Sequence, residues 1–345
     1  MDHTILATLI GLGGGVVLGL AARLGEFCTF GAIESAYMGH DQRRIRIWGI
    51  VLGVAILCVF SLDAIGQINI TKTLYHTISW NPIASIIGGL VFGYGMALSG
   101  NCGFGALARF GGGDLRSLVV VVVIAISGYF TLNGPLANFR IMAFPVTSSD
   151  TPQGFAHMFS AYTGLPPLII AVIIASALIL WALLYAPLRH KKEAMFWGVC
   201  AGLAIASAFW GTSFLREASF EAVTVQAHTY TAPLGRTLLF LMTSSGGGAG
   251  FSVGSVLGVL IGANIGSRIK GHFNWEACED PRELGRQVFG ACLMGMGGVV
   301  AVGCSIGQGV SAFSTLAFSA PVTLAAIVLG AILGIRHLLA GFAPE

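Results

Sequence analysis

Ser99-Gly-Asn-Cys-Gly-Phe-Gly105 and Val302-Gly-Cys-Ser-Ile-Gly-Gln-Gly309 are the two stretches that decide the fold of this chain. One constant shift along the sequence places Cys102 on Cys304. The same shift aligns the flanking segments, Gly88 to Gly128 with Gly290 to Gly330. In each copy a glycine-rich apolar run leads into the cysteine, and a second apolar run follows it. Internal repeats of this kind are common in transporter folds, so the pattern predicts a transport pore.

The composition places the chain in a lipid bilayer. Of its 345 residues 55% are hydrophobic and 10% are charged, and the mean hydropathy is +0.83. Soluble domains carry about 25% charged residues. The 49 glycines predict closely packed and interrupted helices, because glycine lets membrane helices approach one another and marks breaks in them. The net charge of +3 does not indicate nucleic-acid binding, because the basic residues lie in short clusters between apolar runs.

Nine apolar runs are long enough to cross about 30 Å of hydrocarbon. They lie near residues 5–22, 45–62, 83–100, 117–132, 165–186, 193–210, 251–268, 286–303 and 318–336. Shorter segments interrupted by glycine and charge lie near residues 24–36, 103–114, 211–222 and 305–316. A membrane tolerates such segments as re-entrant half-helices where protein or a water-filled cavity satisfies their backbone. The predicted fold is therefore an all-α integral membrane protein with about nine transmembrane helices and four re-entrant half-helix loops, built as a single transporter domain over residues 1–345.

The basic residues predict the orientation of this domain. With nine crossings and an external N-terminus, most of the 18 basic residues fall on the cytoplasmic side, as the positive-inside rule requires. The exceptions are Lys72, Arg140, Arg216 and Arg236. The scheme leaves the C-terminus in the cytoplasm and inverts the first repeat, about 1–133, relative to the second, about 193–340. The span 165–186 is the connector between them, and the half-helices are expected to meet near the midplane.

Cys28, Cys102 and Cys304 are the candidate substrate-path residues. Each is expected at the start of a half-helix, where backbone N–H groups lack helical partners and attract an anion. A thiol adds a polarisable sulfur and a weak donor, which suits a sulfur-bearing anion better than a hard cation such as sodium. The residue aligned with Cys28 in the second repeat is Gly211, so one of the four loops has no cysteine. Alternatively, broken helices need small residues where they pack, and cysteine serves as one of them.

Three neutral side chains accompany these cysteines, namely Asn101, Ser305 and Gln308. They are suited either to bind anion oxygens or to cap the half-helices. Among the charged residues, Arg23 and Glu26 are expected to be interfacial or mutually paired. Two arginines at the expected cytoplasmic mouth, Arg109 and Arg116, either attract anions or anchor the orientation. The chain contains no Cys-x-x-Cys spacing, and neither a metal nor a cofactor is expected.

The segments Glu-Phe-Cys-Thr-Phe-Gly, Ser-Gly-Asn-Cys-Gly-Phe-Gly and Gly-Cys-Ser-Ile-Gly-Gln-Gly resemble the three cysteine motifs of the YeeE/YedE family of bacterial sulfur-compound transporters. The resemblance spans nearly the whole chain. It implies an inner-membrane protein with nine spans and inward-folded loops that takes up thiosulfate, with Cys28, Cys102 and Cys304 as successive sulfur contacts. It also implies a separate cytoplasmic sulfur-carrier protein of the TusA-like type, which would receive the sulfur.

The first motif departs from the family pattern, because Glu26 stands where a basic residue precedes the Phe-Cys pair. A nearby carboxylate disfavours a dianion, so another sulfur or selenium species is an alternative cargo. Two other functions are also open. One is a membrane sulfur-transfer protein that passes sulfur along its thiols as persulfides, and the other is a passive small-anion channel. The favoured prediction is a transporter, not an enzyme, that takes up thiosulfate or a related sulfur anion through a cysteine-lined path.

Overall fold

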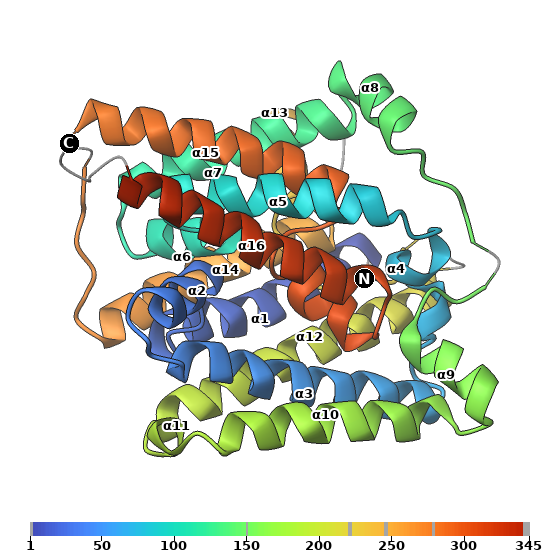
Figure 1. Cartoon of the computed structure of the whole chain (residues 1–345). Coiled ribbons are helices and arrows are strands. Elements are labelled where there is room, and N and C mark those ends of the chain that lie inside the picture. The colour runs from blue at the N-terminus through green and yellow to red at the C-terminus, as the bar shows by residue number, and fades with distance from the viewer. Residues whose placement is uncertain (1–2, 150, 220–222, 245–247, 278–279, 341–345) are drawn as a thin grey trace.

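The computed structural model describes residues 3–149, 151–219, 223–244, 248–277 and 280–340, and all regular elements in these ranges are helices (Figure 1). Seven helices are long and apolar enough to cross a membrane. They are α1 (His3–Leu24), α3 (Arg43–Ala64), α5 (Pro82–Ser99), α7 (Leu115–Leu132), α12 (Lys192–Ala218), α14 (Phe251–Ile269) and α16 (Ser319–Ala340). Two further helices cover the remaining apolar runs, namely α10 (Pro167–Leu183) and α15 (Pro281–Val300). The predicted all-α membrane fold is confirmed, and each of the nine runs contains a long helix.

Three of the four segments expected to form half-helices contain a short helix. These helices are α2 (Thr29–Tyr37), α6 (Gly103–Gly111) and the π-helix η2 (Gly307–Ala312). The other short elements are η1 (Ile70–Lys72), α4 (Leu74–Thr77), α8 (Leu136–Ala143), α9 (Phe155–Thr163), α11 (Ala186–Arg189) and α13 (Ala232–Thr243). The three cysteine motifs thus lie where a long helix gives way to a short one.

The half-helix expected at residues 211–222 is wrong. Helix α12 continues without a break to Ala218, and residues 220–222 lie outside the described ranges. Gly211 instead lies against α1, because a methyl group at this position would come within 2.7 Å of the Ile10 side chain. The short helix in this part of the chain is α13, which begins after Thr231. Gly211 is therefore a helix-packing position.

Glycines bring the long helices into backbone contact. Helices α1 and α14 meet along two sets of glycines spaced four residues apart, Gly11, Gly15 and Gly19 on one helix and Gly254, Gly258 and Gly262 on the other. A side chain at Gly254 or Gly262 would overlap a carbonyl oxygen of α1. This is the small-residue packing that membrane helices use in place of a hydrophobic driving force.

The helices of the two chain halves pair across the molecule. Helix α1 packs on α14 and α12 packs on α3, while α5 packs on both α15 and α16. In Figure 1 the helices α3 and α10 lie along one side of the molecule, and α13 and α15 lie along the opposite side. The inverted symmetry of the repeats stays a prediction, but this pairing places the cysteine loops of both halves in the interior.

Candidate functional site

Each candidate cysteine lies two residues after a residue in the left-handed backbone conformation. The φ angles are 56° at Glu26, 71° at Gly100 and 58° at Val302. A left-handed residue is a common way to end a helix, and α1, α5 and α15 all end just before these positions. For the β-branched Val302 this conformation is strained, and such strain collects at functional sites. The three loops therefore share one local geometry, although only one of them has glycine at the turn.

Cys102 caps the N-terminus of α6 and is completely buried, with 0% of its surface exposed. Its Sγ accepts a hydrogen bond from the Gly105 N–H at 3.4 Å. Cys28 holds the same N-cap position before α2, without a side-chain cap hydrogen bond, and is half-buried. A methyl group at Gly105 would lie 3.7 Å from Cys102 Sγ and 3.8 Å from Cys28 Sγ. The two thiols thus face the same glycine, and these two predicted path residues lie close together.

Cys304 is 1% exposed and holds two segments of chain together. Its Sγ accepts hydrogen bonds from the N–H groups of Tyr230, at 3.2 Å, and Gly307, at 3.3 Å. The hydroxyl of Thr229 lies 3.6 Å from the same sulfur. The sulfur is thus an acceptor for two backbone donors, and its S–H hydrogen remains a weak donor on the side of Thr229.

Thr29 connects the loops of the two halves. Its hydroxyl donates to Ser305 Oγ at 3.1 Å, and the same oxygen lies 3.9 Å from Cys102 Sγ, which can donate to it. Thr29, Cys102 and Ser305 are all buried. This one residue therefore joins the surroundings of Cys102 to the residue that follows Cys304, and sequence reasoning did not single it out.

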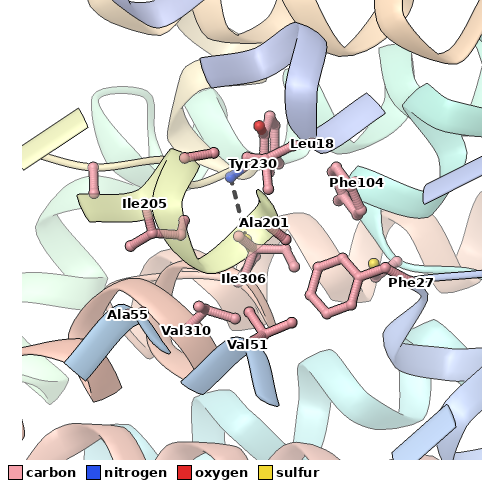
Figure 2. Packing of buried hydrophobic residues seen from close by; sticks show 14 of the residues in the cluster. Leu18, Phe27, Val51, Ala55, Phe104, Ala201, Ile205, Tyr230, Ile306 and Val310 are labelled. Atoms are coloured by element: carbon pink, nitrogen blue, oxygen red, sulfur yellow. Dashed lines mark hydrogen bonds between the residues drawn. The ribbon is translucent and has the colours of Figure 1, made fainter. Parts of the chain in front are cut away.

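A row of aromatic rings lies beside the three thiols. Phe27 and Phe104 have ring centroids 6.1 Å apart, and Phe104 and Tyr230 have centroids 5.2 Å apart. Figure 2 shows these rings among the buried side chains, with Ile306 and Val310 nearby. Phe27 directly precedes Cys28, and Phe104 follows Cys102 by two residues. The backbone N–H of Tyr230 bonds to Cys304. Since the rings and the two central thiols are buried, an anion can reach the thiols only when neighbouring groups move.

The three neutral side chains predicted to assist differ in their surroundings. Ser305 bonds to Thr29 as described, and Asn101 is buried with its Oδ1 unpartnered within the described residues. The amide nitrogen of Gln308 donates to the carbonyl oxygens of Ala301 and Val302, and its Oε1 accepts from Ser319. The Gln308 amide is thus occupied in holding its own loop, which favours the capping role. Anion binding by Asn101 and Ser305 stays a prediction.

The carboxylate of Glu26 points away from the thiol cluster. It pairs with Arg44 at 3.4 Å, and its side chain is 53% exposed. Of the two alternatives expected for Arg23 and Glu26, the described residues do not show the mutual pair, because Arg23 donates to the carbonyl oxygens of Ala108 and Arg109, at 3.0 and 3.2 Å. A solvated and paired carboxylate repels a dianion weakly, so the departure from the family motif does not place a bare negative charge in the path.

The arginines expected at the cytoplasmic mouth are placed differently from each other. Arg116 lies 3.3 Å from Asp114 and 3.3 Å from Glu276, and Arg109 is exposed on α6. The positive charge of Arg116 is therefore balanced by carboxylates, which favours the anchoring role over anion attraction.

A cavity of about 280 Å³ opens beside Cys304. Its wall includes Gly303, which precedes that cysteine, and Thr229, whose hydroxyl contacts the sulfur. Arg140 of α8 and Arg236 of α13 also line it, and the described lining residues include no carboxylate. These arginines are two of the exceptions to the charge rule, and that was the only sequence signal for them. The cavity thus combines two basic side chains with Thr229, which contacts the thiol of Cys304.

A buried histidine bonds to the backbone of the segment that follows Cys304. His76 Nε2 in α4 donates to the Thr315 carbonyl oxygen at 3.1 Å. Burial, and to a lesser extent the neighbouring His157, lower the pKa of His76 from 6.5 to about 4. The neutral imidazole is the form that the folded state favours. Its contribution to stability is therefore complete above pH 6.5 and is lost as the pH falls toward 4.

Substituting His76→Gln should flatten the pH dependence of thermal unfolding between pH 7 and pH 5. Glutamine offers an amide donor to Thr315 but does not titrate, so the variant should lose less stability on acidification than the wild type. Fluorescence-monitored melting of the purified protein at both pH values measures the difference. The exposed His272 gives the control His272→Gln, which should keep the wild-type dependence. An unchanged pH dependence in His76→Gln would show that other groups cause it.

Buried loops suited to an anion, enclosed by helices of membrane-spanning length, define a multi-pass membrane transport protein. The family model described as Sulphur transport matches residues 24–333, and the chain belongs to that family. It is similar to the Thiosulfate transporter TsuA of Spirochaeta thermophila, with 24% identity over 326 residues, which cover 92% of this chain and 94% of the relative. A protein of the same name from Escherichia coli is 24% identical over 340 residues, covering 93% of this chain and 92% of the relative.

Proposed function

We propose that this protein takes up thiosulfate, or a closely related sulfur anion, by passing it along Cys304, Cys102 and Cys28. The observation that carries the proposal is the position of Cys304. Its thiol contacts Thr229, which lines the basic cavity, and the next residue, Ser305, bonds to Thr29 beside Cys102. Membership of the Sulphur transport family and the names of the two relatives support the choice of cargo.

The path begins in the cavity beside Cys304. Arg140 and Arg236 raise the local concentration of anions there, because charges of one sign in a hollow focus the electric field. The anion then meets the hydroxyl of Thr229 and the thiol of Cys304. From there Ser305 and Thr29 lead to Cys102, and the half-buried Cys28 completes the passage.

The passage is non-covalent, and the protein is not an enzyme. Persulfide chemistry needs a thiolate and a base that generates it. Within the described residues, Cys102 and Cys304 are hydrogen-bonded to backbone N–H groups and to threonine hydroxyls, none of which is a general base. Such groups are suited to hold an anion briefly and release it unchanged.

The proposed location is the bacterial inner membrane, with the N-terminus outside and the C-terminus in the cytoplasm. This orientation, with inverted repeats about 1–133 and 193–340, places the basic cavity outside and the Cys28 end inside. A separate TusA-like sulfur-carrier protein would then receive the sulfur at the cytoplasmic side.

Uptake of radiolabelled thiosulfate into proteoliposomes tests the proposed function. The wild-type protein should accumulate label in a saturable manner, and unlabelled thiosulfate should compete better than sulfate. Flux that does not saturate and does not discriminate among small anions would establish the channel alternative. Selective uptake of a different sulfur or selenium anion would change the proposed identity of the cargo but not the proposed path.

Substituting Arg236→Gln should raise the KM for thiosulfate about three- to tenfold at low ionic strength, because a charge that concentrates the anion is lost. The maximal rate should change little, since the thiols are untouched. The difference should shrink in high salt, where the Debye length is short. Arg189→Gln, which removes an exposed charge after α10, is the matched control. An unchanged KM for Arg236→Gln at low salt would remove this residue from the path.

A further inference from the structure

An apolar groove of about 260 Å³ lies on the side of the molecule formed by α3, α10 and α16. Its walls include Gly49 and Leu52 of α3, Trp181 of α10 and Val328 of α16. Thr29 is the one residue with a polar side-chain oxygen among the described lining residues. Beside the groove, α10 and α16 expose hydrophobic side chains such as those of Ile173, Leu180, Leu329 and Leu333. Exposed apolar residues on membrane-spanning helices face lipid, so the groove is open to the bilayer.

One end of the groove carries an unbalanced positive charge. The Arg46 guanidinium stacks 4.1 Å from the centre of the Trp181 ring, which lines the groove. It donates to the Trp181 carbonyl oxygen and to Gln42, while its Nε is buried without a partner within the described residues. None of the ion pairs of the described chain involves Arg46. The hydrogen-bond and ring partners of Arg46 are therefore neutral, and no carboxylate among the described residues pairs with its charge.

More positive charge gathers at the same end of α10. The segment that follows this helix exposes three basic side chains, those of Arg189, Lys191 and Lys192. A cluster of basic residues at a membrane surface attracts anionic lipids. An aromatic ring beside an arginine is also the arrangement that proteins place at the level of the lipid headgroups.

We infer that this groove binds one acyl chain of an anionic phospholipid, with the headgroup phosphate held at Arg46. The apolar walls fit the chain, and the basic end fits the headgroup charge. Under the proposed orientation the lipid comes from the cytoplasmic leaflet. The inference does not depend on the cargo, because it rests on the outer surface of α3, α10 and α16.

The bound chain would lie against residues that hold the thiol cluster. Thr29, which contacts Cys102 and Ser305, lies in the wall of the groove, as do Trp48 and Phe313. The Trp48 ring is 5.2 Å from that of Phe27, the first ring of the aromatic row. An acyl chain in the groove therefore fixes the position of α2 and of the Thr29 hydroxyl.

Photo-crosslinking tests the binding directly. The full-length protein is placed in phosphatidylcholine nanodiscs with a trace of phosphatidylglycerol that carries a diazirine on one acyl chain, and the labelled peptides are mapped. Label is expected on the groove faces of α3, α10 and α16. The variant Val328→Trp fills the groove and should remove this label, whereas Leu329→Trp alters a neighbouring residue that is 56% exposed and should retain it.

The headgroup contact is tested separately in the same assay. Arg46→Gln should reduce groove labelling about fivefold, as expected for one basic residue at an anionic surface. Unlabelled phosphatidylglycerol should compete with the probe in the wild type, and unlabelled phosphatidylcholine should not. Equal competition by both lipids, or full labelling of Val328→Trp, would overturn the inference. These outcomes leave the thiosulfate proposal untouched, because binding is read without transport.

Discussion

Replacing Cys304 with alanine is expected to lower thiosulfate uptake by about two orders of magnitude. The substitution removes the S–H donor and leaves the buried N–H groups of Tyr230 and Gly307 without their acceptor. Each unsatisfied buried group costs about 1–3 kcal/mol, and about 1.4 kcal/mol corresponds to a tenfold effect. The segment that carries Thr229 and Tyr230 should therefore move away from the path. Initial rates in proteoliposomes, normalised to the amount of folded protein, measure the loss.

Serine at the same position separates the role of sulfur from that of packing. Cys304→Ser keeps a small side chain that accepts from both N–H groups and donates a hydrogen, but its oxygen is hard and less polarisable. If sulfur itself contacts the cargo, this variant should remain well below the wild-type rate. Cys292→Ala, at a half-buried position on α15, should transport normally. A wild-type rate in Cys304→Ser would show that the residue serves only as a small packing group.

The substitution Gly15→Ala is expected to destabilise the packing of α1 against α14. A Cβ at Gly15 would overlap the carbonyl oxygen of Ser255 on α14, and two backbones cannot move apart without separating the helices. Overpacking of this kind costs about 1–3 kcal/mol, which for a chain of this size lowers the melting temperature by about 1–4 °C. Thermal unfolding of the detergent-purified protein measures the shift.

Gly13 provides the matched control on the same helix. A methyl group there meets nothing within 4 Å, so Gly13→Ala should be neutral or slightly stabilising, because alanine restricts the unfolded chain. If the two variants melt together, α1 and α14 can adjust their separation, and the close glycine contact is not what holds them.

Hydropathy and glycine spacing predicted the helices of this protein, because helix formation depends on residues that are close together in the chain. The nine runs are helices because run length and apolar content are local properties. Likewise, short helices follow Cys28 and Cys102, at positions that the repeat pattern indicated. Gly211 shows the limit, because a glycine that breaks a helix and one that admits a neighbouring helix look alike until the neighbour is known. Ile10 is that neighbour.

The contacts that join distant loops had no local signal. Thr29 and Ser305 are 276 residues apart in the chain, and nothing in either segment indicates the other. Arg140 and Arg236 were visible only as exceptions to the charge rule, and their shared cavity depends on how α8 and α13 fold back. One available signal was missed, namely Thr231-Ala-Pro233, because proline near the first helical position marks the start of a helix such as α13.

The hydroxyl of Thr29 has a single hydrogen, and in this structure that hydrogen goes to Ser305. On the proposed path, an anion moving from Cys304 toward Cys102 would compete with Ser305 for it, so the bond between the two loops would open only while cargo occupies the gap. Between passages the hydrogen would return to Ser305 and the two loops would meet again. The path would then close through one hydrogen bond, without a large movement of whole domains.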